Sequence, residues 1–125
     1  MRILLDSNIV IWAMTDRTRL STAARSTIRQ ASEVVVSAAT IWEIAIKVGI
    51  GKLELDMNDL MESLDEAGAS RLSVTWEHGL AVQNLPLHHR DPFDRILVAQ
   101  AISEPLKLVT SDARLRLYGE SIHVV

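Results

Sequence analysis

Short apolar runs alternate with longer segments of helical periodicity along the whole chain. The first and third runs are apolar without alternation, which is typical of strands covered on both faces. The strands that this pattern predicts are Arg2–Leu5, Glu33–Val36 and Leu106–Thr110, with weaker candidates at Arg71–Val74 and His123–Val125. The predicted helices are Ile9–Met14, Ser21–Ala31, Ala38–Val48, Asn58–Ala67, Thr75–Asn84 and Phe93–Ser103. Strands that alternate with helices predict an α/β fold, with a mainly parallel sheet and helices on both faces.

The composition narrows the class of protein without naming it. A chain of 125 residues, 48% apolar and 23% charged, is expected to form one globular domain with a sizeable core. It has no cysteine, which excludes disulfides and thiolate metal sites. Its formal charge of −3 does not by itself indicate a nucleic-acid binder. No apolar run approaches the ~20 residues of a membrane span, so we expect a soluble, cytoplasmic protein with no membrane partner.

Two aspartates follow predicted strands directly. Asp6 comes after Ile3-Leu4-Leu5, and Asp112 comes after Leu108-Val109-Thr110-Ser111. The carboxyl ends of parallel strands share one edge of a sheet, and ligands bind at that edge. These two residues are therefore expected to meet, although they are far apart in the sequence.

Two further acids occupy helices that are otherwise almost entirely apolar. Glu43 lies in the segment Ala38–Val48, where it forms a single polar stripe with Thr40 and Lys47. A helix that is apolar nearly all round is expected to be buried, so this stripe is predicted to face a wet cleft. Asp94 falls in the first turn of the last long helix, just after an expected cap at Asp91-Pro92.

Each acid also has an ordinary structural explanation. Asp6 and Asp112 could cap the helices that follow them, Asp94 could interact with the dipole of its helix, and Glu43 could pair with Lys47. Capping, however, requires neither a strand end nor a buried helix. The four together indicate converging carboxylates, which repel one another unless a cation or protons intervene. Oxygen ligands without His or Cys favour a hard ion, Mg²⁺ or Mn²⁺.

Four segments in this order resemble the PIN-domain nucleases, and among them the VapC-like toxins of bacterial toxin–antitoxin pairs. The segments are Leu4-Leu5-Asp6-Ser7-Asn8, Ser37–Ile44, His88–Arg95 with Ala99-Gln100-Ala101, and Leu108–Asp112. The resemblance implies that residues 1–125 form a single PIN-like domain, a three-layer α/β/α sandwich. It also implies a Mg²⁺-dependent ribonuclease that hydrolyses RNA phosphodiester bonds.

Carried over by position, the resemblance makes Asp6, Glu43, Asp94 and Asp112 the catalytic, metal-binding quartet. Because Mg²⁺ keeps several waters, we expect Asp6 and Asp94 as direct ligands, and Glu43 and Asp112 as ligands through water or to a second ion. The supporting residues implied are Asn8, Ser111 and, ranked below Asp94, Asp91.

Contacts with RNA are expected from arginines near Asp94 and Asp112, namely Arg90, Arg95 and Arg114. The nearby His88 and His89 could touch phosphate or carry a proton, but histidines in loops usually do neither. The resemblance further implies a small antitoxin, and a homodimer or a toxin–antitoxin hetero-oligomer. The apolar run Ile9–Met14 and the segment Ile46–Leu53 are candidate docking surfaces for that partner.

Three alternatives stay open at this point. The chain could be a PIN nuclease of RNA maturation without a toxin role, which an adjacent antitoxin gene would exclude. It could be a phosphoacceptor of the receiver type, but Ser7-Asn8 stands where a second acid is wanted, and Lys107 precedes the core of its strand. It could also be a binding module whose acids are purely structural, which only an activity measurement distinguishes.

Overall fold

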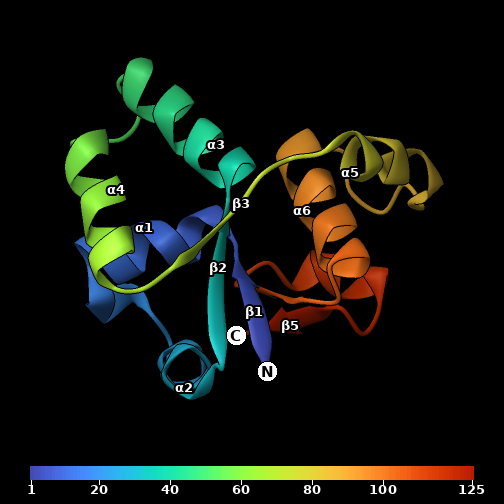
Figure 1. The fold of residues 1–125 in the computed structure, drawn as a ribbon, viewed down its shortest axis with the longest axis horizontal. Helices are drawn as coiled ribbons and strands as arrows, with labels where there is room; N and C mark the ends of the chain where they lie inside the picture. Colours follow the sequence, from blue (N-terminus) through green and yellow to red (C-terminus); the bar gives the residue numbers. More distant parts are fainter.

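The computed structural model describes residues 1–125 and contains one five-stranded sheet in which every pairing is parallel. The strands lie in the order β3-β2-β1-β4-β5, so β1 is central and the chain crosses from it to both sides (Figure 1). Their bounds are β1 Arg2–Leu5, β2 Glu33–Ser37, β3 Ser70–Leu72, β4 Lys107–Thr110 and β5 Ile122–Val124. All five predicted strands are confirmed to within two residues at each end.

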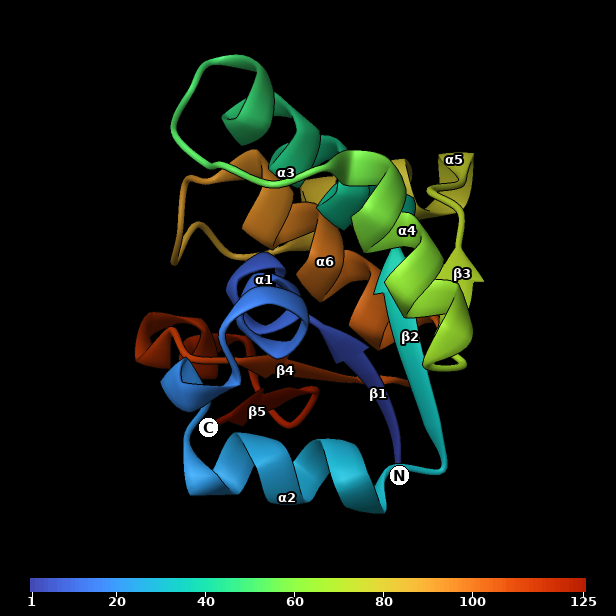
Figure 2. The same cartoon turned by 90° about the vertical axis from the view of Figure 1, so that its left-hand side faces the viewer.

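Helices cover both faces of this sheet, which confirms the three-layer α/β/α architecture. They are α1 Ser7–Thr15, α2 Thr22–Gln30, α3 Ala38–Gly49, α4 Met57–Glu66, α5 Trp76–Ala81 and α6 Pro92–Ser103. There are also three short 3₁₀ segments, one each after α1, α5 and β4: η1 Arg17–Arg19, η2 Val82–Asn84 and η3 Ala113–Tyr118. Figures 1 and 2 show α1 and α4 on one side of the sheet and α5 and α6 on the other. The helix α3 contacts both α1 and α6.

Two apolar cores separate the layers. One lies between the sheet and helices α1, α2 and α4, and includes Ile3, Ile9 and Leu60. The other lies under α6 and η3, and includes Leu4 and Leu97. The consecutive residues Ile3, Leu4 and Leu5 of β1 thus enter alternate cores, which is why the strand is apolar at all three of these positions. No helix in the chain is both long enough and apolar enough to cross a bilayer.

Side-chain caps set where several helices begin. Asp6 caps α1, so this helix starts at Ser7, two residues before the predicted start. Asp91 accepts hydrogen bonds from the backbone N–H groups of Phe93 and Asp94, with Pro92 in the first turn, as expected from Asp91-Pro92. The predicted helix Thr75–Asn84 is instead α5 followed by the 3₁₀ segment η2.

Candidate metal centre

The ends of β1 and β4 bring Asp6 and Asp112 to the same edge of the sheet. Asp6 is buried, and both of its carboxylate oxygens are bonded: the backbone N–H of Ser7 donates to Oδ1 at 2.7 Å, and the hydroxyl of Thr110 donates to Oδ2 at 2.6 Å. The hydroxyl oxygen of Thr110 in turn accepts from the backbone N–H of Asp112 at 3.0 Å. A single threonine therefore connects the two strand ends and the two acids.

The third acid, Glu43, reaches this edge from the middle of α3. The hydroxyl of Ser7 donates to its Oε1 at 2.5 Å, and Lys47 Nζ lies 3.4 Å from its Oε2. Ser7 thus contacts Asp6 through its backbone and Glu43 through its side chain. This double contact fixes the two carboxylates relative to one another, because Ser7 is itself buried at the start of α1.

The fourth acid, Asp94, enters from the first turn of α6 with a side chain that is only 17% exposed. Burial raises the pKa of Asp94 to about 7, and repulsion from Asp6, Asp91, Glu43 and Asp112 adds to this rise. The carboxylate therefore costs free energy in the absence of a cation. Asp6, Asp91, Glu43 and Asp112 therefore lie near enough to Asp94 to repel its carboxylate.

The other two aspartates at the sheet edge respond to opposite influences. Burial raises the pKa of Asp6, against the effect of its bonds from Thr110 and Ser7. The guanidinium of Arg114 instead lowers the pKa of Asp112, by donating to both of its oxygens. Asp112 is thus ionised at neutral pH, and Asp6 and Asp94 are the acids that a bound cation would relieve.

The ordinary structural roles of these acids also exist, alongside their convergence. Asp6 and Asp112 cap α1 and η3, Asp94 lies in the first turn of α6, and Glu43 pairs with Lys47. The caps hold Asp6 and Asp112 at the shared edge of the sheet. Capping and metal binding are therefore compatible explanations here rather than competing ones.

A donor set of carboxylate oxygens fits Mg²⁺ or Mn²⁺, and the repulsion among the acids supplies the reason for a cation to bind. One ligand atom each from His89, Asp94 and Asp112 lie within 4.8 Å of one another. Asp6 is linked to this group through Thr110, which bonds both Asp6 and the backbone of Asp112, and Glu43 is linked to Asp6 through Ser7. The four predicted acids thus stand together, and a histidine joins them.

The hydrogen bonds that hold Asp6 and Glu43 come from Ser7 and Thr110, the sequence neighbours of the predicted Asn8 and Ser111. Asn8 and Ser111 are exposed and make no side-chain hydrogen bond, whereas Ser7 and Thr110 hold the acids. Thr110 had a signal in the sequence, because a hydroxyl inside a strand covered on both faces needs a partner.

The three predicted arginines differ in what their guanidinium groups do. Arg90 is exposed, and Arg114 is bonded to Asp112 at the rim of the site. Arg95 is unavailable to RNA, because its terminal nitrogens donate to the carbonyls of Val82, Leu85, Pro86 and His89 and to the hydroxyl of Tyr118. Its role is to hold the loop before α6 in place, so the prediction that it contacts RNA was wrong.

The prediction that α3 is buried all round was also wrong. Its inner face is buried as expected, but Trp42 is 64% exposed and Ile46 is 40% exposed. These two side chains line a largely apolar groove between α3, α5 and α6, together with Val74 and Phe93. The ring of Phe93 meets that of Trp42 edge-on, with 4.9 Å between centroids. We call this the α3–α5 groove.

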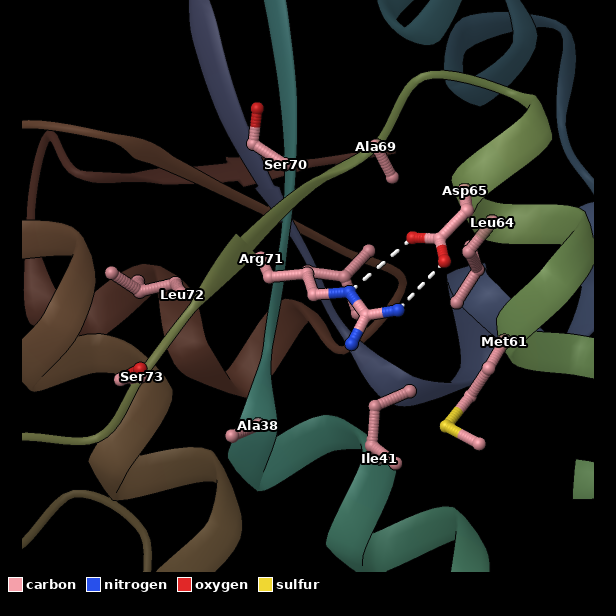
Figure 3. A pocket seen from close by; sticks show the side chains of 11 residues that line it. Ala38, Ile41, Met61, Leu64, Asp65, Ala69, Ser70, Arg71, Leu72 and Ser73 are labelled. Atoms are coloured by element: carbon pink, nitrogen blue, oxygen red, sulfur yellow. Dashed lines mark hydrogen bonds and ion pairs between the residues drawn. The ribbon is translucent and has the colours of Figure 1, made fainter. Parts of the chain in front are cut away.

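A second hollow lies on the other side of α3, against the edge strand β3 (Figure 3). Ile41, Met61 and Leu64 line it, and Arg71 forms an ion pair with Asp65 across it at 2.6 Å. None of the four acids of the candidate site contributes to its lining. The hollow is therefore separate from the metal centre.

Comparison with known proteins gives a consistent result. A family model described as PIN domain matches residues 3–120. Ribonuclease VapC22 of Mycobacterium tuberculosis is 32% identical over 117 residues, which span 91% of this chain and 89% of that protein.

Solved structures share the fold at lower sequence identity. VapBC2 from Rickettsia felis, bound to a DNA fragment from their promoter, superposes with a TM-score of 0.70 at 14% identity, over 100% of this chain and 98% of that one. FitAcB from Neisseria gonorrhoeae has a TM-score of 0.65 at 20% identity, over 93% and 91% of the two chains. At these identities the likeness concerns the fold alone.

Proposed function

The chain belongs to the PIN domain family, and from this premise we propose that it is a ribonuclease that hydrolyses RNA phosphodiester bonds with a divalent cation. The observation that carries the proposal is the convergence of Asp6, Glu43, Asp94 and Asp112 at one sheet edge, with a pKa of about 7 at Asp94. A structural cluster has no reason to gather acids that repel one another. A site that binds Mg²⁺ or Mn²⁺ does.

The residues divide the work of the reaction among them. When bound, the cation supplies a water of lowered pKa and neutralises charge on the phosphate. Asp6 and Asp94 would hold it directly, and Glu43 and Asp112 would do so through water. Thr110 and Ser7 keep Asp6 and Glu43 in place, since they bond three of their four oxygens.

Positive charge for the phosphate comes from the rim of the site. Arg114 lies beside Asp112 with its side chain 73% exposed, and Arg90 is exposed next to the cap of α6. Arg114 is hydrogen-bonded to Asp112, and Arg90 directly precedes Asp91 in the chain. This leaves Arg90 and Arg114 as the proposed RNA contacts.

We expect the purified protein to cleave mixed cellular RNA with Mg²⁺ or Mn²⁺, and to lose that activity completely with excess chelator. Products would be followed by gel electrophoresis, and activity should return when Mg²⁺ is added back beyond the chelator. Cleavage that persists in excess chelator would contradict a metal-dependent mechanism. Absence of cleavage under all conditions, with the protein folded, would favour a binding module.

We further propose that the nuclease is a toxin held inactive by a small protein antitoxin. The name of the curated relative and the complexes formed by the structural relatives motivate this role. The α3–α5 groove is the proposed docking surface, because an apolar groove with exposed Trp42 is costly in water unless a partner covers it. The run Ile9–Met14 is less suitable, since Ile9, Val10 and Ile11 are buried in the core.

Co-expression with the product of the adjacent small open reading frame tests this role. A stable complex should co-purify, relieve growth inhibition, and be weakened at least tenfold by Trp42→Ala. The matched control is Ile102→Ala, since Ile102 is also a large exposed apolar residue but lies outside the groove. Full nuclease activity without any effect on growth of the host would instead favour a role in RNA maturation.

A further inference from the structure

The loop before α6 places the imidazole of His89 inside the acidic site. The side chain is 11% exposed, and its Nε2 atom is buried without a hydrogen-bond partner. Nε2 lies 3.4 Å from Oδ2 of Asp94 and 3.5 Å from Oδ2 of Asp112. No other basic side chain lies within 4.0 Å of Asp94.

The hydrogen bonds around His89 decide which ring nitrogen carries the proton. The backbone N–H of Asp91 donates to Nδ1 at 3.1 Å, so the lone pair of the ring is on Nδ1. The proton of the neutral imidazole is then on Nε2. A metal ligand needs a free lone pair, so Nε2 in this tautomer presents an N–H to the two carboxylates and is not a ligand.

Both polar groups of the His89 backbone are hydrogen-bonded. Its N–H donates to the hydroxyl of Tyr118 at 3.1 Å, and its carbonyl accepts from Arg95 at 3.4 Å. The direction of the Nε2–H bond is thus set before any substrate arrives. These contacts give the loop histidine a place in the site that its sequence position did not suggest.

We propose that His89 is a positioning residue, whose Nε2–H lies 3.4 Å from Asp94 and 3.5 Å from Asp112, donates to these carboxylates when the cation is bound, and holds them in the orientation that binds it. The inference rests on the proposed metal-dependent activity. A carboxylate that gives one oxygen to a cation is oriented by a hydrogen bond to its other oxygen. Asp112 has Arg114 for this purpose, whereas Asp94 has no other side chain, so Asp94 depends most on His89.

The first test measures cation affinity without RNA. Titration of Mn²⁺ into the metal-free protein by calorimetry should show that His89→Ala weakens binding by about 10- to 100-fold. His89→Gln should recover most of the loss, because its amide can donate from near the position of Nε2. His88→Ala is the matched control, since His88 is exposed and packs on Tyr118 outside the acids, and it should bind Mn²⁺ like the original protein.

The second test needs no variant and reads the tautomer directly. In a ¹⁵N NMR spectrum of labelled histidines, His89 should show the Nε2–H tautomer both without Mg²⁺ and with it. Loss of the Nε2 proton on adding Mg²⁺ would make His89 a ligand and overturn the proposal, as would equal Mn²⁺ affinity in His89→Ala. If the original protein binds no Mn²⁺ at all, the proposed function fails first, and this inference fails with it.

Discussion

Replacing Asp94 with Asn is expected to abolish RNA cleavage while it stabilises the metal-free protein. Burial and four neighbouring acids raise the pKa of Asp94 to about 7, so its ionised form is unfavourable without a cation. Asparagine keeps the size of the side chain and removes the charge. Loss of a group that supports several kcal/mol of transition-state stabilisation lowers the rate by roughly 10³-fold or more.

A variant that loses activity but gains stability cannot have lost its activity by misfolding. Cleavage would be measured on one defined RNA, and the free energy of unfolding by urea titration at pH 8 with chelator present. Asp91→Asn is the matched control, because Asn caps a helix about as well as Asp and should cost little activity. If Asp91→Asn were inactive and Asp94→Asn active, Asp91 rather than Asp94 would be the acid of the metal site.

Asp6→Asn should lose activity to the same extent but gain less stability. Its carboxylate caps α1 and accepts from Thr110, so the amide disturbs favourable contacts as well as relieving repulsion. The difference in the free energy of unfolding between the two variants thus measures how much more the carboxylate of Asp6 contributes to the fold than that of Asp94. A larger stability gain for Asp6→Asn than for Asp94→Asn would contradict this division.

The sequence predicts the parallel sheet and the two aspartates at its strand ends because both follow from one geometric rule. Strands that are apolar at consecutive positions must be covered on both faces, which requires a parallel sheet with helices around it. In such a sheet the residues after β1 and β4 meet at one edge, and Asp6 and Asp112 do. Knowing the sheet is therefore nearly enough to place these two aspartates.

The contacts around the acids could not be predicted in the same way. Whether Ser7 or Asn8 faces Glu43 depends on where α1 begins, and the cap at Asp6 moved that start by two residues. His89 reaches the site because Arg95 and Tyr118 hold its loop, and periodicity carries no information about loops.

The exposed face of α3 could not be predicted from composition either. An apolar helix indicates burial, but the pattern does not say whether the burying surface is in the same chain or in a partner. Trp42 is exposed here for that reason, since nothing in the chain covers the α3–α5 groove.

The stability of the metal-free protein should fall as the pH rises from about 4 to above 7. In this interval native Asp94 keeps a proton that the unfolded chain, with a pKa of 3.8, has released. The native state therefore binds more protons, and the free energy of unfolding decreases with pH. The favourable contribution is complete below the unfolded pKa and is lost as the pH passes the folded one. Asp6, whose pKa is also raised, adds to the same trend.

The lowered pKa of Asp112 makes the protein less stable as the pH falls, and this effect occurs at lower pH. Arg114 stabilises its ionised form, and this contribution is lost only as the pH falls below the unfolded value of 3.8. A titration between pH 5.5 and 8 therefore leaves out the contribution of Asp112, and comparison with Asp94→Asn separates Asp94 from the four histidines, which also change charge in this range. Over that range the loss at Asp94 is at most about 2 kcal/mol, since pH 5.5 lies about 1.5 units below the folded pKa and each unit is worth about 1.36 kcal/mol. Partial solvation of the site lowers this value.

Urea unfolding of the original protein and of Asp94→Asn at pH 5.5 and pH 8 would test this, with and without Mg²⁺. The original protein should lose stability toward pH 8 and Asp94→Asn should lose much less, while Asp65→Asn should follow the original protein because Asp65 pairs with Arg71 far from the acids. A cation that binds only the native site stabilises it by about 2.7 kcal/mol at a hundredfold excess over its Kd. Mg²⁺ should therefore restore the original protein at pH 8 and leave Asp94→Asn nearly unchanged. The same pH dependence in both proteins would show that repulsion at Asp94 does not limit the stability of this fold.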